Sequence, residues 1–291
     1  MATGYTTTGS LADSLDTVVD SARIIHEYKG VMSQLVERTQ LPEGTGLDWG
    51  EVAYAKLTAS TVTETMVNEN YQQLSDTAIS ITPTMVQIAT LITDRLRARI
   101  TEKGLAKIGM LSENAILRKI DEDGLAVLDT ATTSLVGAGS TLASGYIGAA
   151  TRRIKGNTTE TIEGPVRAVL HSYQVHDLQS EIVASVGTYS LTPGRTAEVF
   201  QSGFKGFVLG AEIFEDGNIT IDSSDDAKGG VFAQSAIVLV EGMNAKVETE
   251  RKPGIGGGSD IVYVRREYAY GERYGGVGMF EIYSDATAPT S

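Results

Sequence analysis

The sequence predicts an α+β fold, and three observations support this class. Apolar residues follow helical spacing in the first half of the chain, around 11–25 and 112–128. From Gly164 onward, short β-rich runs alternate with short helical runs, without a regular strand–helix–strand repeat. The chain has 291 residues, 41% of them hydrophobic, so it can bury a sizeable core as one large domain or two ordinary ones.

The composition excludes several classes of chemistry. The chain has no cysteine, which excludes a disulfide framework, a thiolate metal site and a cysteine nucleophile. It has only 3 histidines, and its net charge of −13 argues against coating nucleic acid through its phosphates. No signal peptide or transmembrane segment is evident, so we expect a cytoplasm-like compartment and no membrane partner.

The first segment, residues 10–40, is predicted to be helical in two pieces separated by Gly30. Ser10 is a suitable N-cap for the first piece, and Leu41–Pro42 ends the second. A single amphipathic arm cannot bury its own apolar stripe, so it must dock on another surface. The stripes consist of Leu11, Leu15, Val18, Val19, Ala22 and Ile25, and then of Val31, Met32, Leu35 and Val36.

Residues 49–82 are rich in β-branched and small residues, without a long apolar run. This pattern predicts two strands of a long, thin hairpin with mixed faces. Such a hairpin has too little apolar surface to be stable by itself, so we expect contact with another chain to order it. An edge hairpin on the protein's own sheet remains the alternative.

After Pro83, residues 84–129 are predicted to be mainly helical. The clearest helix starts at Ser112, with Gly124 on its apolar face, where a close neighbour could pack. The alternating Arg95, Arg97 and Arg99 favour a strand just before that helix. Residues 130–163 are rich in Gly, Ser, Thr and Ala and are interpreted as a long loop or a strand–loop region. The apolar face of the helix comprises Ile116, Leu117, Ile120, Val127 and Leu128.

The second half is predicted to contain mostly strands. We expect a helix at 173–185 and a turn formed by the glycine-rich segment 252–260. The expected strands are residues 166–170, 207–214, 236–240, 247–251, 261–270 and 277–283.

Two glycine-rich runs are candidates for phosphate binding, and neither has the required context. Residues 254–258 are followed by a strand, and residues 137–139 lack a third small residue because Leu142 occupies that position. Residues 201–250 carry a net charge of −6, and the acidic stretch 212–226 lacks the ligand order of a calcium loop. We interpret that stretch, and the acidic residues 121–123, as solvated.

His171 and His176 are five residues apart, and Asp177 follows them. Helical metal pairs need a spacing of four, so we expect a structural or capping histidine rather than a metal site. The sequence therefore predicts no catalytic, cofactor-binding or metal-ligating residue. If the chain were instead a soluble α+β enzyme or binding module, its pocket would be lined by His171, His176 and Asp177.

The second half also resembles the major capsid proteins of tailed bacteriophages, which have the Hong Kong 97-type fold. Each matching stretch is weak alone, and their order along the chain carries the resemblance. The stretches are GPVRAVLH at 164–171 with Tyr173, Gln174 and Leu178, then 206–210 through Asn218, 230–239, 247–251 and 270–282.

The resemblance implies a division of the chain into named parts. Residues 1–45 would be the N-terminal arm and 46–83 the extended E-loop. Residues 84–150 and 245–275 would form the peripheral domain with its long spine helix, and 151–244 and 276–291 the axial domain.

The resemblance also implies a structural, non-enzymatic function. Pentamers and hexamers of the chain would close into an icosahedral shell around double-stranded DNA, which is enclosed without sequence-specific binding. The subunit would be assembled in the host cytoplasm and reside in the virion, with a separate scaffolding protein, a portal and decoration proteins as partners. A cellular nanocompartment shell of the encapsulin type is the alternative. Some relatives cross-link an E-loop lysine, but Lys56 has no evident acceptor.

Overall fold

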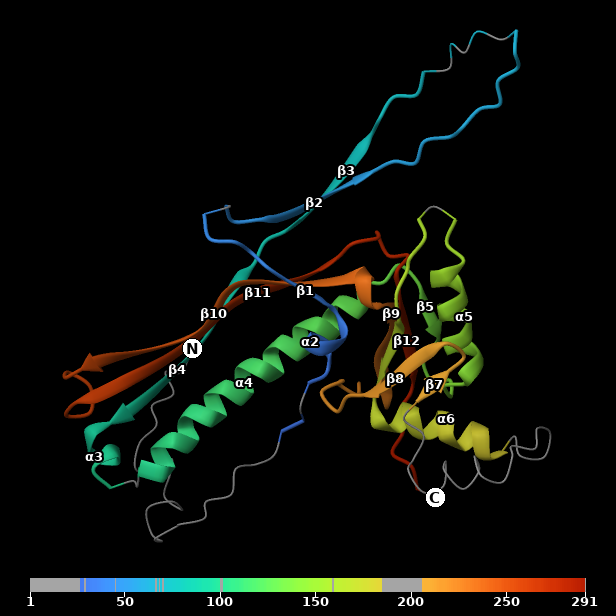
Figure 1. The fold of residues 1–291 in the computed structure, drawn as a ribbon. Coiled ribbons are helices and arrows are strands. Elements are labelled where there is room, and N and C mark those ends of the chain that lie inside the picture. Colours follow the sequence, from blue (N-terminus) through green and yellow to red (C-terminus); the bar gives the residue numbers. More distant parts are fainter. Residues whose placement is uncertain are drawn as a thin grey trace.

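The computed structural model describes residues 27–184 and 206–290, apart from positions 29, 45, 66, 68, 70, 100, 101 and 159. The helical stripe predicted at 11–25, and His26, lie outside these residues. The described chain forms two sheets side by side, a long helix beneath them and a hairpin that projects away (Figure 1).

The first sheet forms one lobe and packs on the long helix α4 (Glu102–Leu128). β1 runs parallel to β10, whereas β11 runs antiparallel to both of its neighbours. The turn between β10 and β11 is the predicted glycine-rich segment, in which Gly258 donates its N–H to the Ile255 carbonyl at 3.0 Å. The strand order is β1 (Glu37–Gln40), β10 (Ile237–Lys252), β11 (Ser259–Glu272) and β4 (Thr84–Thr93).

The prediction that residues 84–129 are mainly helical is wrong at the beginning of this range. Residues Thr84–Thr93 form β4, because Val86 and Ile88 alternate with exposed positions and pack toward α4. The arginines at 95 and 97 lie in a one-turn helix, α3 (Asp94–Arg97), rather than in a strand. Thr93 caps this turn by accepting the Leu96 N–H at 3.3 Å.

The long helix starts ten residues before the predicted cap. Ser112 lies inside α4 and donates its hydroxyl to the Ile108 carbonyl at 3.1 Å. The predicted apolar face is confirmed at Ile116, Ile120 and Leu128, which are buried, whereas Leu117 is exposed. Serine is common at helix N-caps, but inside a helix its hydroxyl can instead donate to a carbonyl of the preceding turn. The sequence does not distinguish the two cases, and this explains why the predicted start lies too late.

The second sheet forms the other lobe. Residues 130–163, predicted to form a loop or a strand–loop region, contribute a strand, β5, which the second alternative allows, and a helix, α5 (Ser144–Lys155), which the prediction lacks. The predicted strand at 166–170 and helix at 173–185 are confirmed as β6 and α6 (Ser172–Ala184). The strand order is β5 (Ser134–Val136), β12 (Met279–Asp285), β9 (Asp226–Ala233), β6 (Val166–Leu170), β8 (Ala211–Glu215) and β7 (Phe207–Val208).

Two corrections in this sheet have clear physical causes. The single strand predicted at 207–214 is a hairpin, because Leu209 and Gly210 take φ values of 46° and 99° and form a two-residue turn. Strand β9 was not predicted from the sequence. Both of its faces are buried, so apolar and polar residues do not alternate along it as they do along a half-buried strand. Val231 faces the cluster around α5, whereas Phe232 faces the cluster around α4.

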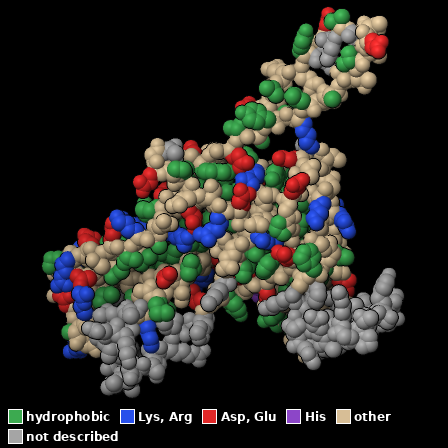
Figure 2. Space-filling model, in the orientation of Figure 1, with side chains coloured by type: hydrophobic (Ala, Val, Ile, Leu, Met, Phe, Trp, Pro, Cys, Tyr) green, Lys and Arg blue, Asp and Glu red, His purple; other side chains and the backbone are tan. Residues whose placement is uncertain are grey.

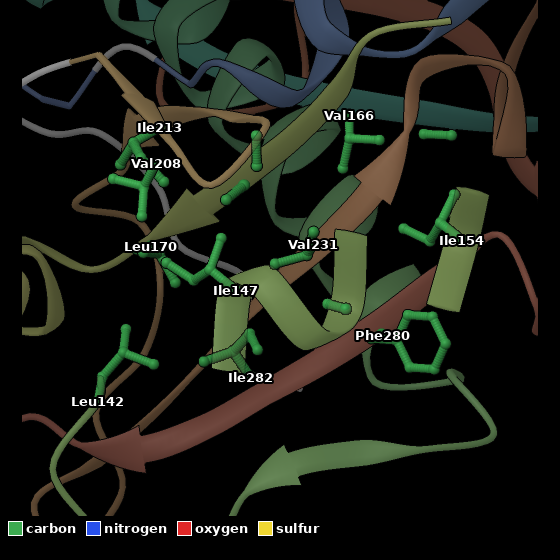
Figure 3. Packing of buried hydrophobic residues seen from close by; sticks show 14 of the residues in the cluster. Leu142, Ile147, Ile154, Val166, Leu170, Val208, Ile213, Val231, Phe280 and Ile282 are labelled. Atoms are coloured by element: carbon green, nitrogen blue, oxygen red, sulfur yellow. The ribbon is translucent and has the colours of Figure 1, made fainter. Parts of the chain in front are cut away.

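The core of the second lobe lies between α5 and the sheet (Figure 3). Ile147 and Ile154 of α5 are fully buried, and they meet side chains from several strands of the sheet. These partners are Val166 and Leu170 of β6, Val208 and Ile213 of β7 and β8, Val231 of β9, and Phe280 and Ile282 of β12.

The described part of the predicted arm between residues 27 and 40, called the arm segment below, joins the lobes. Its second predicted helix is only one turn long, α2 (Met32–Leu35), after which the chain enters β1 and pairs with β10. Met32 and Leu35 are buried in the same cluster as Ile120 of α4, so the predicted docking of this apolar stripe is confirmed.

The predicted hairpin is confirmed by strands β2 (Trp49–Tyr54) and β3 (Asp76–Ile81), which pair antiparallel. Only its base adjoins the first sheet, and the remainder extends well beyond both lobes (Figure 1).

Candidate assembly surface

One arginine fastens the base of the hairpin to the first sheet. Arg273 donates from Nη1 and Nη2 to the carboxylate oxygens of Glu37 at 2.5 and 3.2 Å, and from Nε to Oε2 of Glu51 at 2.8 Å. Glu37 lies in β1 and Glu51 in β2, and only 15% of the arginine side chain is exposed. The planar guanidinium group thus connects the hairpin to the lobe through charge-assisted hydrogen bonds to two carboxylates.

An apolar contact accompanies this ion pair. Ile81, the last residue of β3, is buried against Val238 and Val240 of β10, with Trp49 beside it. Gly271 in β11 makes room for Ile81, because a Cβ at position 271 would lie 2.2 Å from the Ile81 Cδ1 atom. The base of the hairpin is therefore positioned by the lobe, through both packing and charge.

Beyond its base, the hairpin exposes large apolar side chains to solvent. Tyr54 is 74% exposed and Tyr71 is 88% exposed. The projection is narrow, and Figure 2 shows hydrophobic side chains along it. A two-stranded ribbon cannot cover such side chains by itself, so they require another surface. The exposed apolar residues, called the hairpin patch below, are Val52, Tyr54, Leu57, Val62, Val67, Tyr71 and Leu74.

Hydrogen bonds also connect the two sides of the hairpin beyond the ends of β2 and β3. Ala55 donates its N–H to the Ser75 carbonyl at 2.9 Å, and Thr58 donates its N–H to the Gln72 side chain at 2.8 Å. Lys56 donates from Nζ to the Thr158 carbonyl at 3.3 Å, so it contacts the second lobe of its own chain.

The two histidines with a predicted structural role occupy different elements. His171 follows β6 and caps α6, because its Nδ1 accepts the Tyr173 N–H at 3.2 Å, as predicted. Burial lowers the pKa of His171, which favours the neutral, accepting ring. His176 lies within α6, and burial raises the pKa of its neighbour Asp177. The two cavities discussed below are not lined by these three residues.

The glycine loops bind parts of the chain itself. Gly139 donates its N–H to Oδ1 of Asp226 at 2.7 Å, in the position that a phosphate oxygen would need. Asp226 is buried, as is Asp216, so the interpretation of 212–226 as a solvated stretch is wrong at these two positions. Their backbone segments enter the core, and local sequence does not reveal this.

The interpretation of 121–123 as solvated is also wrong at Asp121. Asp121 of α4 is 2% exposed, and Asn218 donates hydrogen bonds both to it and to Asp216, which is 1% exposed. Burial, together with Asp121, raises the pKa of Asp216 to about 7. This pair was not predicted from the sequence. The glycine at position 30 is the feature of the sequence that reflects it, because a Cβ there would lie 2.2 Å from Asp121.

A cavity of about 490 Å³ lies beside this pair, between the arm segment, α4 and β11. Glu27, Arg118 and the exposed Leu117 border it. A smaller one, of about 170 Å³, lies between α4 and the residues around Asn218. Within the described ranges, no cluster of three or more His, Asp or Glu could hold a metal ion. The described helices also include none that is long and apolar enough to cross a membrane.

The chain is similar to solved structures of phage capsids over almost its whole length. A chain of "Cyanophage Pam1 capsid asymmetric unit" matches with a TM-score of 0.72 and 12% identity, covering 99% of this chain and 100% of that chain. "Capsid structure of the Cyanophage P-SCSP1u" matches with 0.70 and 11%, covering 99% and 97%. "Mycobacterium phage Che8" matches with 0.69 and 18%, covering 90% and 94%.

No protein-family model and no curated protein matches the sequence. At these identities, the structural matches establish the fold: the chain has the fold of phage capsid proteins, of the predicted α+β class. The resemblance noted in the sequence is confirmed at this level.

Proposed function

We propose that this chain is a major capsid subunit, whose activity is self-assembly through pentamers and hexamers into an icosahedral shell around phage double-stranded DNA. The hairpin patch is the observation that supports the proposal. Its apolar side chains are exposed in the single chain, so they require a surface on a neighbouring copy. The likeness to phage capsid structures supports the same function and a location in the virion.

The proposed parts of the chain follow the two sheets. The arm is residues 1–45 and the E-loop 46–83. The first sheet with α4 forms the peripheral domain, proposed at 84–150 and 245–275, and the second forms the axial domain, at 151–244 and 276–291. Residues 134–136 pair with a strand of the second sheet, and residues from Ile237 onward pair within the first, which supports shifting both proposed boundaries accordingly.

A structural role without catalysis is part of this proposal. The acidic charge of −13 suits a shell that encloses DNA without gripping it. Scaffolding, portal and decoration proteins are the further partners that such a role implies.

The experiment shortens the hairpin without disturbing its base. Residues 56–74 are replaced by Asn-Gly, which closes a tight turn between Ala55 and Ser75, already joined by a backbone hydrogen bond. We expect the shortened chain to fold, because Trp49, Ile81 and the Arg273 ion pairs remain, but to form no closed shells in negative-stain images. A wild-type-like circular dichroism spectrum reports the fold.

The matched control replaces Thr58 and Gln72 by alanine, because these residues bridge the hairpin but lie outside the patch. We expect the control to assemble. Normal closed shells from the shortened chain would refute the role of the hairpin. Enzyme cargo, rather than nucleic acid, inside wild-type shells would instead indicate a nanocompartment.

A further inference from the structure

Two buried carboxyl groups meet where the arm segment, the long helix and the second lobe come together. Asp121 lies in α4, and Asp216 follows β8. Both are almost completely buried, and Asn218 donates a hydrogen bond to each of them. Two ionised carboxylates in one buried site repel each other, so the protonation of such a pair matters for the contacts that it makes.

The pair holds the arm segment by its backbone. Val31 donates its N–H to Oδ2 of Asp216 at 3.3 Å, and Met32 donates its N–H to Oδ1 of Asp121 at 3.0 Å. Gly30 makes the close approach possible, since any side chain there would overlap Asp121. Each carboxyl group thus binds one of two successive amides, and both bonds hold the same turn of chain.

Asn218 connects the two carboxyl groups from the other side. Its N–H is donated to Oδ1 of Asp216 at 2.9 Å, and its Nδ2 is donated to Oδ2 of Asp121, also at 2.9 Å. The second lobe, the helix and the arm therefore share one hydrogen-bonded cluster, and the backbone amides already occupy most of its acceptors.

Among the described residues, the arginines nearest to the pair are bound to other carboxylates. Arg118 of α4 lies 3.2 Å from Glu27 and 3.6 Å from Glu122, so it is engaged with other carboxylates. Arg38 and Arg266 both pair with Glu241. In the part of the chain that the structure describes, other titratable groups near the cluster are Tyr28 on the arm, Asp123 on α4, Tyr268 and Tyr270 on β11, Lys228 on β9, Glu215 on β8 and His171 after β6.

We propose that Asp121 and Asp216 form a proton-operated latch, which holds residues 30–32 against α4 while the pair shares one proton and weakens when that proton leaves. In the latched state, the carboxyl O–H of Asp216 is donated to a carboxylate oxygen of Asp121. On opening, the proton passes to solvent, the hydrogen bond between the two side chains is lost, and two carboxylates face each other. The latch lies within one chain, so it does not depend on the proposed function.

The direction of the pH dependence follows from proton binding. The folded chain keeps this proton up to about pH 7, whereas the ordinary pKa of 3.8 applies in the unfolded chain. Between these values the folded state binds more protons, so the latch is strongest at the acidic end and is lost as the pH rises through the window.

The experiment compares hydrogen exchange of residues 31–36 at pH 5 and pH 8, after correction for the intrinsic dependence of exchange on pH. In the wild-type chain, we expect protection of this segment to fall by about tenfold to a hundredfold between the two values. Asp216→Asn supplies a permanent donor to Asp121, so its protection should change little with pH. Asp225→Asn, an exposed aspartate at φ 61° that asparagine tolerates, is the control with the same change of charge.

Wild-type protection that stays constant from pH 5 to pH 8 would overturn the latch, and this measurement needs no variant to fold. The same holds if Asp225→Asn flattens the profile as much as Asp216→Asn. A steep profile in the wild type and in Asp225→Asn, beside a flat one in Asp216→Asn, is the result that supports it.

Discussion

Gly124 and Gly109 lie in the same helix but have different surroundings. A Cβ at position 124 would lie 2.9 Å from the Met32 Cβ and 3.0 Å from the Tyr270 ring, whereas a Cβ at position 109 would meet open space. The apolar face of α4 in the sequence already indicated close packing at Gly124. That the neighbour is the arm segment emerges only from the structure.

We therefore expect opposite effects from the same substitution at these two positions. Gly124→Ala should lower the free energy of unfolding by about 1–3 kcal/mol, because the arm must move away from the helix. Gly109→Ala should raise it by about 0.5–1 kcal/mol, because alanine is the better helix former. Chemical denaturation of the unassembled subunit measures both, and equal signs would contradict this view of the α4 surface.

At the scale of elements, the hairpin shows how a segment with little core of its own is held. Its base depends on Arg273 and Ile81, while its remaining length depends on cross-strand hydrogen bonds. The sequence predicted the hairpin and its lack of independent stability. It could not identify Arg273 as the anchor, because Glu37 and Glu51 are more than 200 residues away from it along the chain.

Replacing Arg273 by lysine should loosen the base of the hairpin, because an ammonium group cannot form the fork to Glu37 and also reach Glu51. We expect a loss of roughly 1–3 kcal/mol, seen as faster hydrogen exchange in β2 and β3. Arg251→Lys is the matched control, since Arg251 also binds two carboxylates, Asp94 and Asp260, but is 51% exposed. Its replacement should change stability much less, because solvent screens an exposed ion pair. Equal effects in the two variants would show that the Arg273 cluster is no anchor.

At the scale of the whole molecule, the two lobes are one continuous structure. Strand β9 crosses the second sheet, and after a single 3-10 turn (Gln234–Ala236) the chain enters β10 of the first. The end of α4 packs under β9 and β12, while its length supports β11 and β4. Helix α4 and the arm segment therefore contact both lobes, and the 3-10 turn joins the two sheets directly.

The net charge of −13 also acts at this scale. In the proposed assembly, like-charged subunits would repel each other, and salt screens such repulsion over a Debye length of about 8 Å at physiological ionic strength. Raising the salt concentration from about 0.05 to about 0.5 M should therefore lower the protein concentration at which shells form, as measured by light scattering. Assembly that weakens with added salt would show instead that ion pairs between subunits dominate.

The sequence by itself determined those features that local pattern encodes. The hairpin, the strand at 166–170, the capping role of His171 and the apolar face of α4 all follow from spacing and turn chemistry over a few residues. The order of weak motifs along the second half also indicated the phage capsid fold, although no single motif did so.

The tertiary structure alone decided which polar groups are buried and which strands are covered on both faces. Asp121, Asp216 and Asp226 look solvated in sequence, yet each is enclosed by segments far away in the chain. Strand β9 is covered on both faces, so it shows no period of two. Burial is a property of the packed lobes, and this is why a window of neighbouring residues could not reveal it.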